Sequence, residues 1–200
     1  MSGFVRRVVT GHDKQGKAIV ISDGIAPMVH QNAFVAGYKT SDVWKTTAMP
    51  APISREEPDA ISGPRSFVDP MGTKIRISEI PPETEATRQI TVEQARQMFS
   101  KSGKNLTSTY EEGGRHPMMH RTETIDYAVV LEGEITLLLD EEDVVLRAGD
   151  VVIQRGTNHA WSNRSGKNVR ILYLLVDGRF DDEMAALFKP AQSNKANKGE

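Results

Sequence analysis

Short apolar segments separated by turn residues dominate the second half of the chain. These segments are Ile125–Leu131, Glu134–Leu139, Val144–Leu146, Val151–Ile153 and Val169–Val176. Glycine, aspartate and asparagine recur in the short stretches between them, as is typical of tight turns. Closely spaced strands with turn residues between them predict a β-sandwich or a small β-barrel.

The first half of the chain combines extended segments with one clear helical pattern. Val5–Thr10 and Ala18–Ser22 flank a turn-rich link and predict a β-hairpin. Thr91–Lys101 predicts a helix, because Thr91 can cap it with Gln94 three residues later and the apolar residues recur at helical spacing. The remaining segments expected to be extended are Phe34–Tyr38, Val43–Thr47 and Lys74–Ile80.

Proline and polar residues suggest where the domain begins and ends. Met49–Pro64 is rich in proline and predicts an irregular connection. We therefore expect an N-terminal extension over residues 1–67, packed on the barrel or on a partner subunit, and a β-barrel over residues 68–178. Within residues 179–200, Asp181–Lys189 predicts a short helix and Ala191–Glu200 a disordered tail.

Composition narrows the class of protein. The chain has 200 residues, enough for one domain with a core, and a formal net charge of −2. It has no basic block, so nucleic acid is not an expected partner. It has no cysteine, which excludes disulfides and thiolate metal ligands. No signal-peptide pattern opens the chain and no apolar run approaches the ~20 residues that cross a bilayer, so we expect a cytoplasmic protein without a membrane partner.

A spaced set of glycine, histidine and acidic residues overlies the predicted strands. It reads Gly114-x5-His120-x-Thr122-x3-Asp126-x6-Gly133, then Gly149-Asp150, and then Gly156-x2-His159-x3-Asn163. Residues at even spacing along a strand share one face, so His120, Thr122 and Asp126 are expected to point the same way. Glu123 has the opposite parity and is expected to lie outside.

Two imidazoles and a carboxylate are the donors of an open-sided metal site. His120, Asp126 and His159 are therefore candidate ligands of Fe, Mn, Ni or Zn, with Thr122 beside them. The alternative is a site without metal, in which His120 and His159 act as acid–base groups and Asp126 and Thr122 fix their tautomers. In either form these four residues are the candidate catalytic residues.

Three other residues are candidates for contact with a substrate. Arg155 could hold a carboxylate or a phenolate, although a solvated turn arginine is the simpler and favoured interpretation. Trp161 shares parity with His159 and could form a wall of the cavity. His116 lies before Pro117 and is expected at the mouth of the barrel.

The spaced motif resembles the two-part signature of the cupin superfamily. In that signature the first part supplies two histidines and a glutamate, and the second part supplies the last histidine. Here Thr122 and Asp126 occupy the middle positions, which is similar to a subgroup of small single-domain cupins from bacteria and fungal polyketide gene clusters. The resemblance implies an all-β fold, the double-stranded β-helix or cupin jelly roll, with N-terminal extension strands and one or two short helices.

The resemblance also implies a function. Several cupins of this kind are described as oxidoreductases, so we expect a small-molecule enzyme that acts on an oxygenated aromatic or polyketide-like intermediate. An isomerase, lyase or decarboxylase, with or without metal, is one alternative, and a non-catalytic cupin that binds a small ligand is another. Since both apolar sheet faces need cover, we also expect a homodimer.

Overall fold

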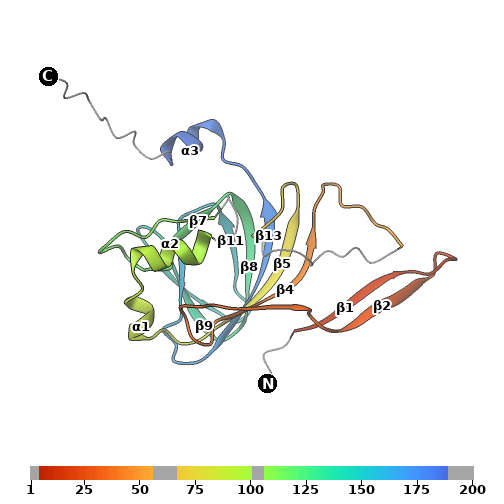
Figure 1. The fold of residues 1–200 in the computed structure, drawn as a ribbon, viewed down its shortest axis with the longest axis horizontal. Coiled ribbons are helices and arrows are strands. Elements are labelled where there is room, and N and C mark those ends of the chain that lie inside the picture. The colour runs from red at the N-terminus through yellow and green to blue at the C-terminus, as the bar shows by residue number, and fades with distance from the viewer. Residues whose placement is uncertain (1–4, 56–66, 101–105, 189–200) are drawn as a thin grey trace.

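The strands form two facing layers in the structure, a computed structural model that describes residues 5–55, 67–100 and 106–188 (Figure 1). The first layer is a six-stranded antiparallel sheet in the order β11-β8-β13-β5-β4-β3. Its strands are β11 (Val151–Arg155), β8 (Thr124–Glu132), β13 (Val169–Asp177), β5 (Thr73–Ile80), β4 (Lys39–Thr46) and β3 (Met28–Gln31).

The second layer is built from two smaller sheets. One has the order β10-β9-β12, and the other pairs β6 with β7. These strands are β10 (Asp143–Arg147), β9 (Glu134–Leu138), β12 (Ala160–Ser162), β6 (Leu106–Ser108) and β7 (His120–Thr122). An isolated antiparallel bridge between His120 and His159 joins the two sheets.

The apolar core fills the space between the layers. Val130 of β8 and Ile171 of β13 are 1% and 0% exposed, and they pack in one cluster with Ile135 and Leu137 of β9. Because each strand presents alternate residues to this space, the period-two pattern of the sequence specifies which face is buried. The predicted all-β jelly roll is confirmed.

The strands expected from the hydrophobic pattern are present with small shifts of their ends. The five segments of the second half correspond to β8, β9, β10, β11 and β13, and Lys74–Ile80 corresponds to β5. The predicted hairpin is β1 (Arg6–His12) and β2 (Ala18–Ile25), and Val43–Thr47 forms the end of β4. Part of the predicted connection Met49–Pro64 lies outside the described residues.

The expectation of an extended segment over Phe34–Tyr38 was wrong. These residues form bends and a turn between β3 and β4. The side-chain Oδ1 of Asn32 accepts the backbone N–H groups of Phe34 (2.8 Å) and Val35 (3.0 Å). An asparagine that satisfies backbone donors in this way competes with strand pairing, so a turn forms despite the apolar residues.

Three short helices accompany the strands in the described residues. The predicted helix is α2 (Val92–Ser100), and its capping box is present: Gln94 N–H donates to Thr91 Oγ1 (3.2 Å), and Thr91 N–H donates to Gln94 Oε1 (2.9 Å). The predicted C-terminal helix is α3 (Asp182–Leu187). Helix α1 (Glu85–Arg88) was not predicted, because a single turn is too short to show helical periodicity. The predicted tail Ala191–Glu200 lies outside the described residues.

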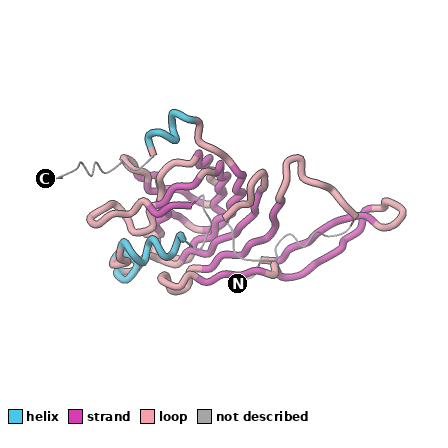
Figure 2. Tube along the Cα trace, turned by 45° about the horizontal axis from the view of Figure 1, so that its top comes forward, coloured by secondary structure: helices cyan, strands magenta, loops and turns pink. Residues whose placement is uncertain are grey.

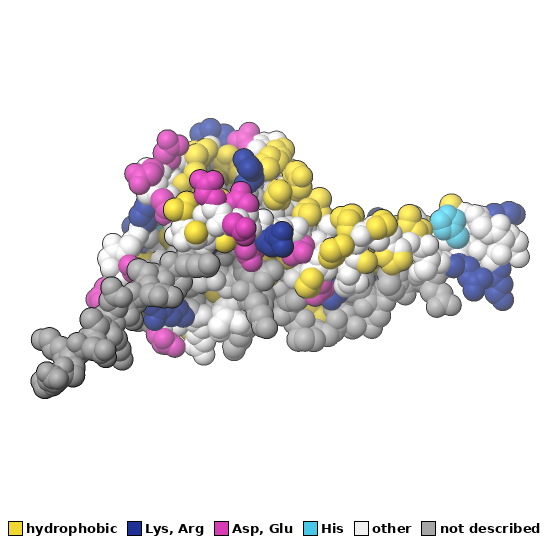
Figure 3. Space-filling view, turned by 90° about the horizontal axis from the view of Figure 1, so that it is seen from above, with side chains coloured by type: hydrophobic (Ala, Val, Ile, Leu, Met, Phe, Trp, Pro, Cys, Tyr) yellow, Lys and Arg dark blue, Asp and Glu magenta, His cyan; other side chains and the backbone are white. Residues whose placement is uncertain are grey.

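The N-terminal hairpin projects from the rest of the molecule as an arm (Figures 1 and 2). Within the described chain, β1 and β2 pair only with each other, whereas β3 and β4 extend the six-stranded sheet. Hydrophobic side chains are visible along the arm and on the adjoining surface (Figure 3). None of the helices in the described chain is long and apolar enough to cross a membrane.

Candidate functional site

Backbone pairing places two histidines side by side. His120 opens β7 and His159 lies just before β12; each backbone N–H donates to the carbonyl of the other, both at 2.9 Å. Directly opposite residues of an antiparallel pair project to the same face of the sheet. The two ring centroids are accordingly 4.2 Å apart. The fold therefore presents the two imidazoles to the interior as a pair.

Both imidazoles are held in a defined tautomer. His120 Nδ1 lies 2.8 Å from the carbonyl oxygen of Met118, and His159 Nδ1 lies 3.0 Å from that of Thr157. A carbonyl oxygen only accepts, so Nδ1 carries the proton in each ring and Nε2 keeps a lone pair. Burial lowers the pKa of His120 to about 4 and that of His159 well below its ordinary value. Both rings are thus neutral at pH 7.

Asp126 supplies a carboxyl group to the same interior space. It lies on β8, is 4% exposed, and its Oδ1 atom has no hydrogen-bond partner among the described residues. Burial raises the pKa of Asp126 to about 6, although a hydrogen bond from Thr124 and the charge of Arg76 act in the opposite direction. A carboxyl group of this kind can hold or release a proton near neutral pH.

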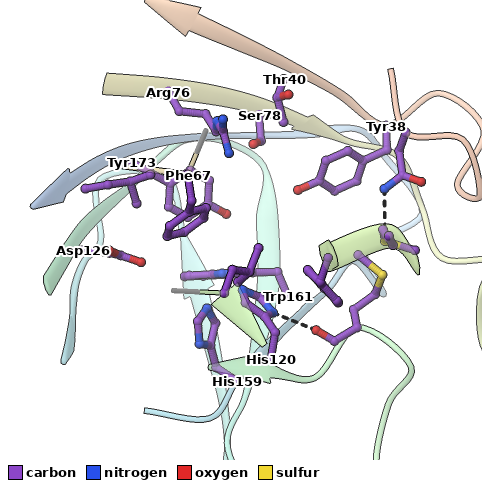
Figure 4. A pocket seen from close by; sticks show the side chains of 16 residues that line it. Tyr38, Thr40, Phe67, Arg76, Ser78, His120, Asp126, His159, Trp161 and Tyr173 are labelled. Carbon is purple, nitrogen blue, oxygen red and sulfur yellow. Dashed lines mark hydrogen bonds between the residues drawn. The ribbon is translucent and has the colours of Figure 1, made fainter. Parts of the chain in front are cut away.

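These three side chains line one cavity with two different walls (Figure 4). Its volume is about 110 Å³, and it is partly open to solvent. Phe99, Leu106, Met118 and Trp161 lie on the side of the histidine pair. Thr40, Arg76, Ser78 and Tyr173 lie across from it, on the inner face of the six-stranded sheet. An apolar cavity with a few converging polar groups is the usual form of a small-molecule site.

Strand β5 has an unusual orientation that the sequence analysis missed. Its polar residues Lys74, Arg76 and Ser78 are 3%, 6% and 1% exposed, whereas Ile75 and Ile77 are half-buried on the other face. A strand normally turns its apolar residues to the core. This alternation of polar and apolar residues was visible in the sequence. It indicates that the interior next to β5 is lined by polar side chains.

A buried ion pair accounts for part of this polar interior. Arg76 donates from Nε to Asp42 Oδ1 (2.6 Å) and from Nη2 to Asp42 Oδ2 (3.0 Å), and Lys74 Nζ lies 3.6 Å from the same carboxylate. Burial raises the pKa of Asp42, but the hydrogen bonds and charge of Arg76 outweigh it, so this pKa lies below its ordinary value. The guanidinium of Arg76 is therefore already matched by an anion.

The other candidate residues from the sequence lie in different places. Trp161 lines the cavity, with its ring edge-on to His159 at 6.1 Å between centroids. Thr122 is buried behind the cavity, where its hydroxyl lies 2.8 Å from that of Thr124, which in turn bonds to Asp126. Thr122 thus reaches Asp126 through Thr124. Glu123 lies outside the barrel, where its carboxylate accepts from the Phe180 N–H (3.4 Å).

Two residues proposed for substrate contact do not line this cavity. Arg155 is exposed at the end of β11, because the neighbouring Gln154 takes the inward position. His116 is buried, but it hydrogen-bonds through Nε2 to Glu83 and accepts the Met118 N–H at Nδ1 (3.1 Å). It therefore anchors the segment that holds Met118, whose carbonyl orients His120.

The arrangement does not fit the three-ligand metal centre considered from the sequence. Among the described residues, no group of three or more His, Asp or Glu side chains is placed to hold a metal ion. The two Nε2 lone pairs are suitable donors, but Asp126 does not complete a set with them in this geometry.

The fold and the site define a β-barrel with an interior cavity lined by two histidines and an aspartate. Residues 106–175 match the model of the Cupin_2 family, described as "Cupin domain". Residues 106–175 are thus similar to a cupin domain, as the histidine motifs implied.

Curated relatives include proteins named for biosynthesis clusters and proteins named as cupin-domain-containing oxidoreductases. "Phomopsin biosynthesis cluster protein C'" of Diaporthe leptostromiformis is 62% identical over 53 residues, 26% of this chain and 28% of that protein. "Oryzines biosynthesis cluster protein J" of Aspergillus oryzae is 46% identical over 68 residues, 33% of this chain and 38% of that protein. "Cupin-domain-containing oxidoreductase virC" of Hypocrea virens is 41% identical over 63 residues, 30% of this chain and 32% of that protein. The aligned segments thus span well under half of these relatives.

Solved cupin structures resemble the chain only distantly. The Cnp3 cupin domain of Schizosaccharomyces pombe is 11% identical, with a TM-score of 0.40 over 93% of this chain and 96% of that one.

Proposed function

We propose that this protein is a cupin-type small-molecule enzyme of secondary metabolism. Its substrate is an oxygenated aromatic or polyketide-like intermediate that binds inside the barrel. One observation carries the proposal: two neutral imidazoles with free Nε2 lone pairs and a carboxyl group with a raised pKa line one largely apolar cavity. The names of the relatives from biosynthesis clusters support the metabolic context.

The side chains supply proton transfer. Nε2 of His120 or His159 accepts a proton from the substrate, and burial keeps the ring neutral until it does so. Asp126 projects into the same cavity from β8 and returns a proton when it is in its acid form. Proton transfers of this kind complete an isomerisation without another reactant. An oxidation needs in addition an electron acceptor, either dioxygen or a hydride-accepting cofactor, that takes two electrons from the oxygenated carbon. The names of the relatives favour this second reaction class, an oxidoreductase.

Metabolite profiles test the catalytic role directly. The gene is replaced in its own organism by versions that encode the parent, His120→Ala, His159→Ala or the control His12→Ala, which lies exposed at the end of β1. We expect one intermediate to accumulate with His120→Ala and with His159→Ala, and normal profiles with the control. Normal profiles in both site variants, with the proteins folded, would contradict the proposal and favour a cupin that only binds its ligand.

The role of Asp126 and the question of a metal are tested on purified protein. Fe, Mn, Ni and Zn are measured in the parent and in Asp126→Asn, purified without added metal. In the acid–base form of the proposal, the metal content of both proteins stays at background, while the pH dependence of turnover changes in Asp126→Asn. Stoichiometric metal in the parent that falls in the variant would instead make Asp126 a ligand.

A further inference from the structure

Four polar atoms in the cavity have no partner within the described chain. They are Thr40 Oγ1, Ser78 Oγ, Asp126 Oδ1 and Tyr173 Oη. Their residues are between 1% and 8% exposed. A buried polar atom without a hydrogen bond destabilises the folded chain. Such atoms gathered in one cavity indicate a ligand that supplies the missing hydrogen bonds.

Strand register arranges these atoms as a strip across four neighbouring strands. Thr40 on β4 pairs directly with Ser78 on β5, and Arg76 on β5 pairs with Tyr173 on β13. Asp126 on β8 pairs with Leu175 of β13. The strip faces the histidine pair across the cavity (Figure 4). A ligand that bridges the cavity would therefore meet hydroxyl groups at one edge and imidazoles at the other.

The chemistry of the strip selects an uncharged, oxygen-bearing edge. Three of the four groups are hydroxyls, which donate and accept equally well. Burial raises the pKa of Tyr173 well above its ordinary value, so its phenol stays protonated. Arg76 is already paired with Asp42, and Asp126 is itself an acid. The strip thus offers no unmatched positive charge to a carboxylate.

We propose that Thr40, Ser78 and Tyr173 determine specificity by binding hydroxyl and carbonyl oxygens on one edge of an uncharged aromatic or polyketide-like ligand. This binding turns the opposite edge of the ligand toward His120 and His159. The inference rests on the proposed function for its substrate class, but it concerns recognition and not the chemical step.

Affinity for matched probes tests the strip. Binding of a dihydroxynaphthalene, naphthalene and naphthoate is measured by calorimetry on the parent, Thr40→Val, Ser78→Ala and Tyr173→Phe. Each substitution removes one hydroxyl and keeps the shape of the side chain. We expect each to weaken dihydroxynaphthalene about tenfold and to leave naphthalene unchanged, because only the former bonds to the lost group. Naphthoate should bind less tightly than dihydroxynaphthalene to the parent.

Thermal unfolding of the same variants supplies a second signature. The hydroxyls of Thr40 and Tyr173 have no hydrogen-bond partner among the residues that the structure describes, so Thr40→Val and Tyr173→Phe should leave Tm unchanged or higher. The matched control is Ser162→Ala, whose buried hydroxyl donates to Glu83 Oε2 (2.8 Å) outside this cavity. It should lower Tm by about 2–4 °C without changing the ratio of the two affinities.

The outcomes separate this inference from the proposed function. The proposed role of the strip would be wrong if the ratio of the affinities for dihydroxynaphthalene and naphthalene were the same in the parent and in the strip variants. It would also be wrong if naphthoate bound most tightly of the three probes. If Thr40→Val and Tyr173→Phe lowered Tm but left the ratio of the two affinities unchanged, water alone would satisfy the hydroxyls. This result would also contradict the proposed role of the strip. If the ratios change as expected while His120→Ala and His159→Ala leave metabolite profiles normal, the strip stands and the enzymatic function fails.

Discussion

Two Arg–Asp pairs of nearly the same geometry hold different parts of this molecule. In the barrel, Arg76 donates two hydrogen bonds to Asp42, of 2.6 and 3.0 Å, and both residues are buried. In the arm, Arg6 donates two hydrogen bonds of 2.7 Å to Asp23, but the two side chains are 70% and 44% exposed. Solvent screens the second pair and not the first.

The comparison extends to the apolar residues of the two regions. β13 lies between β8 and β5, with Val169, Ile171 and Leu175 at most 2% exposed. The arm leaves Val8, Val20 and Ile25 between 48% and 59% exposed. These apolar residues of β13 are thus buried within the chain, whereas an isolated two-stranded hairpin is marginally stable in water. We expect the barrel and the arm to respond very differently to equivalent substitutions.

The largest expected difference is between the two ion pairs. Asp42→Asn leaves Arg76 and Lys74 buried beside a neutral amide, and should lower the free energy of unfolding by about 3–5 kcal/mol. Asp23→Asn in the arm should produce no measurable change. Urea denaturation of both variants checks this. Adding Arg76→Met to Asp42→Asn should restore part of the loss, because it removes one of the uncompensated charges.

Core truncation should give the next largest contrast. Ile171→Ala on β13 should cost about 2–5 kcal/mol, because it leaves a cavity in the centre of the sheet. Ile25→Ala on the arm should change the unfolding free energy by less than about 0.5 kcal/mol. Comparable losses in the two variants would mean that the arm is packed as closely as the barrel, contrary to this comparison.

The sequence predicted most of the barrel because its signal is local. Period-two alternation and turn residues identify each strand of the second half without knowledge of its neighbours. The misreading of Phe34–Tyr38 and the omission of Glu85–Arg88 have local causes too. In the first, Asn32 turns the chain against its apolar composition, and in the second, a single turn of helix carries no periodicity.

The candidate site was only half predictable, for a different physical reason. His120, Asp126 and His159 follow from motif spacing and parity along their strands. Thr40 and Ser78 do not, since they meet through the pairing of β4 with β5, far from the motif in sequence. Register between distant strands is set by the whole fold. The polar residues at alternate positions of β5 were the sequence signal that could have identified this wall of the cavity.

Acid should destabilise the barrel through Glu83. Burial raises the pKa of Glu83, but hydrogen bonds from His116 and Ser162 outweigh it and lower the pKa to about 2. A folded-state pKa below the unfolded one stabilises the fold above the ordinary carboxyl range, and this contribution is lost as pH falls toward 2. Glu83→Gln should therefore be less stable than the parent at pH 7. As the pH falls from about 4.5 to 3, the variant should lose less unfolding free energy than the parent does. Urea midpoints measure this, with exposed Glu132→Gln as the control.

The smallest effect on folding should come from the arm, where the homodimer predicted from the sequence can be tested. Val8→Lys and Val20→Lys place charges on exposed apolar positions and should leave the unfolding free energy of the barrel within about 0.5 kcal/mol of the parent. If the arm is covered by a second copy of the chain, sedimentation equilibrium should show a dimer for the parent and a monomer for these variants. Val151→Lys, at the equally exposed edge strand β11, is the matched control and should stay dimeric. If only Val151→Lys lost the dimer, the interface would lie at the β11 edge of the sheet and not at the arm. A parent that is monomeric at every concentration would contradict the homodimer.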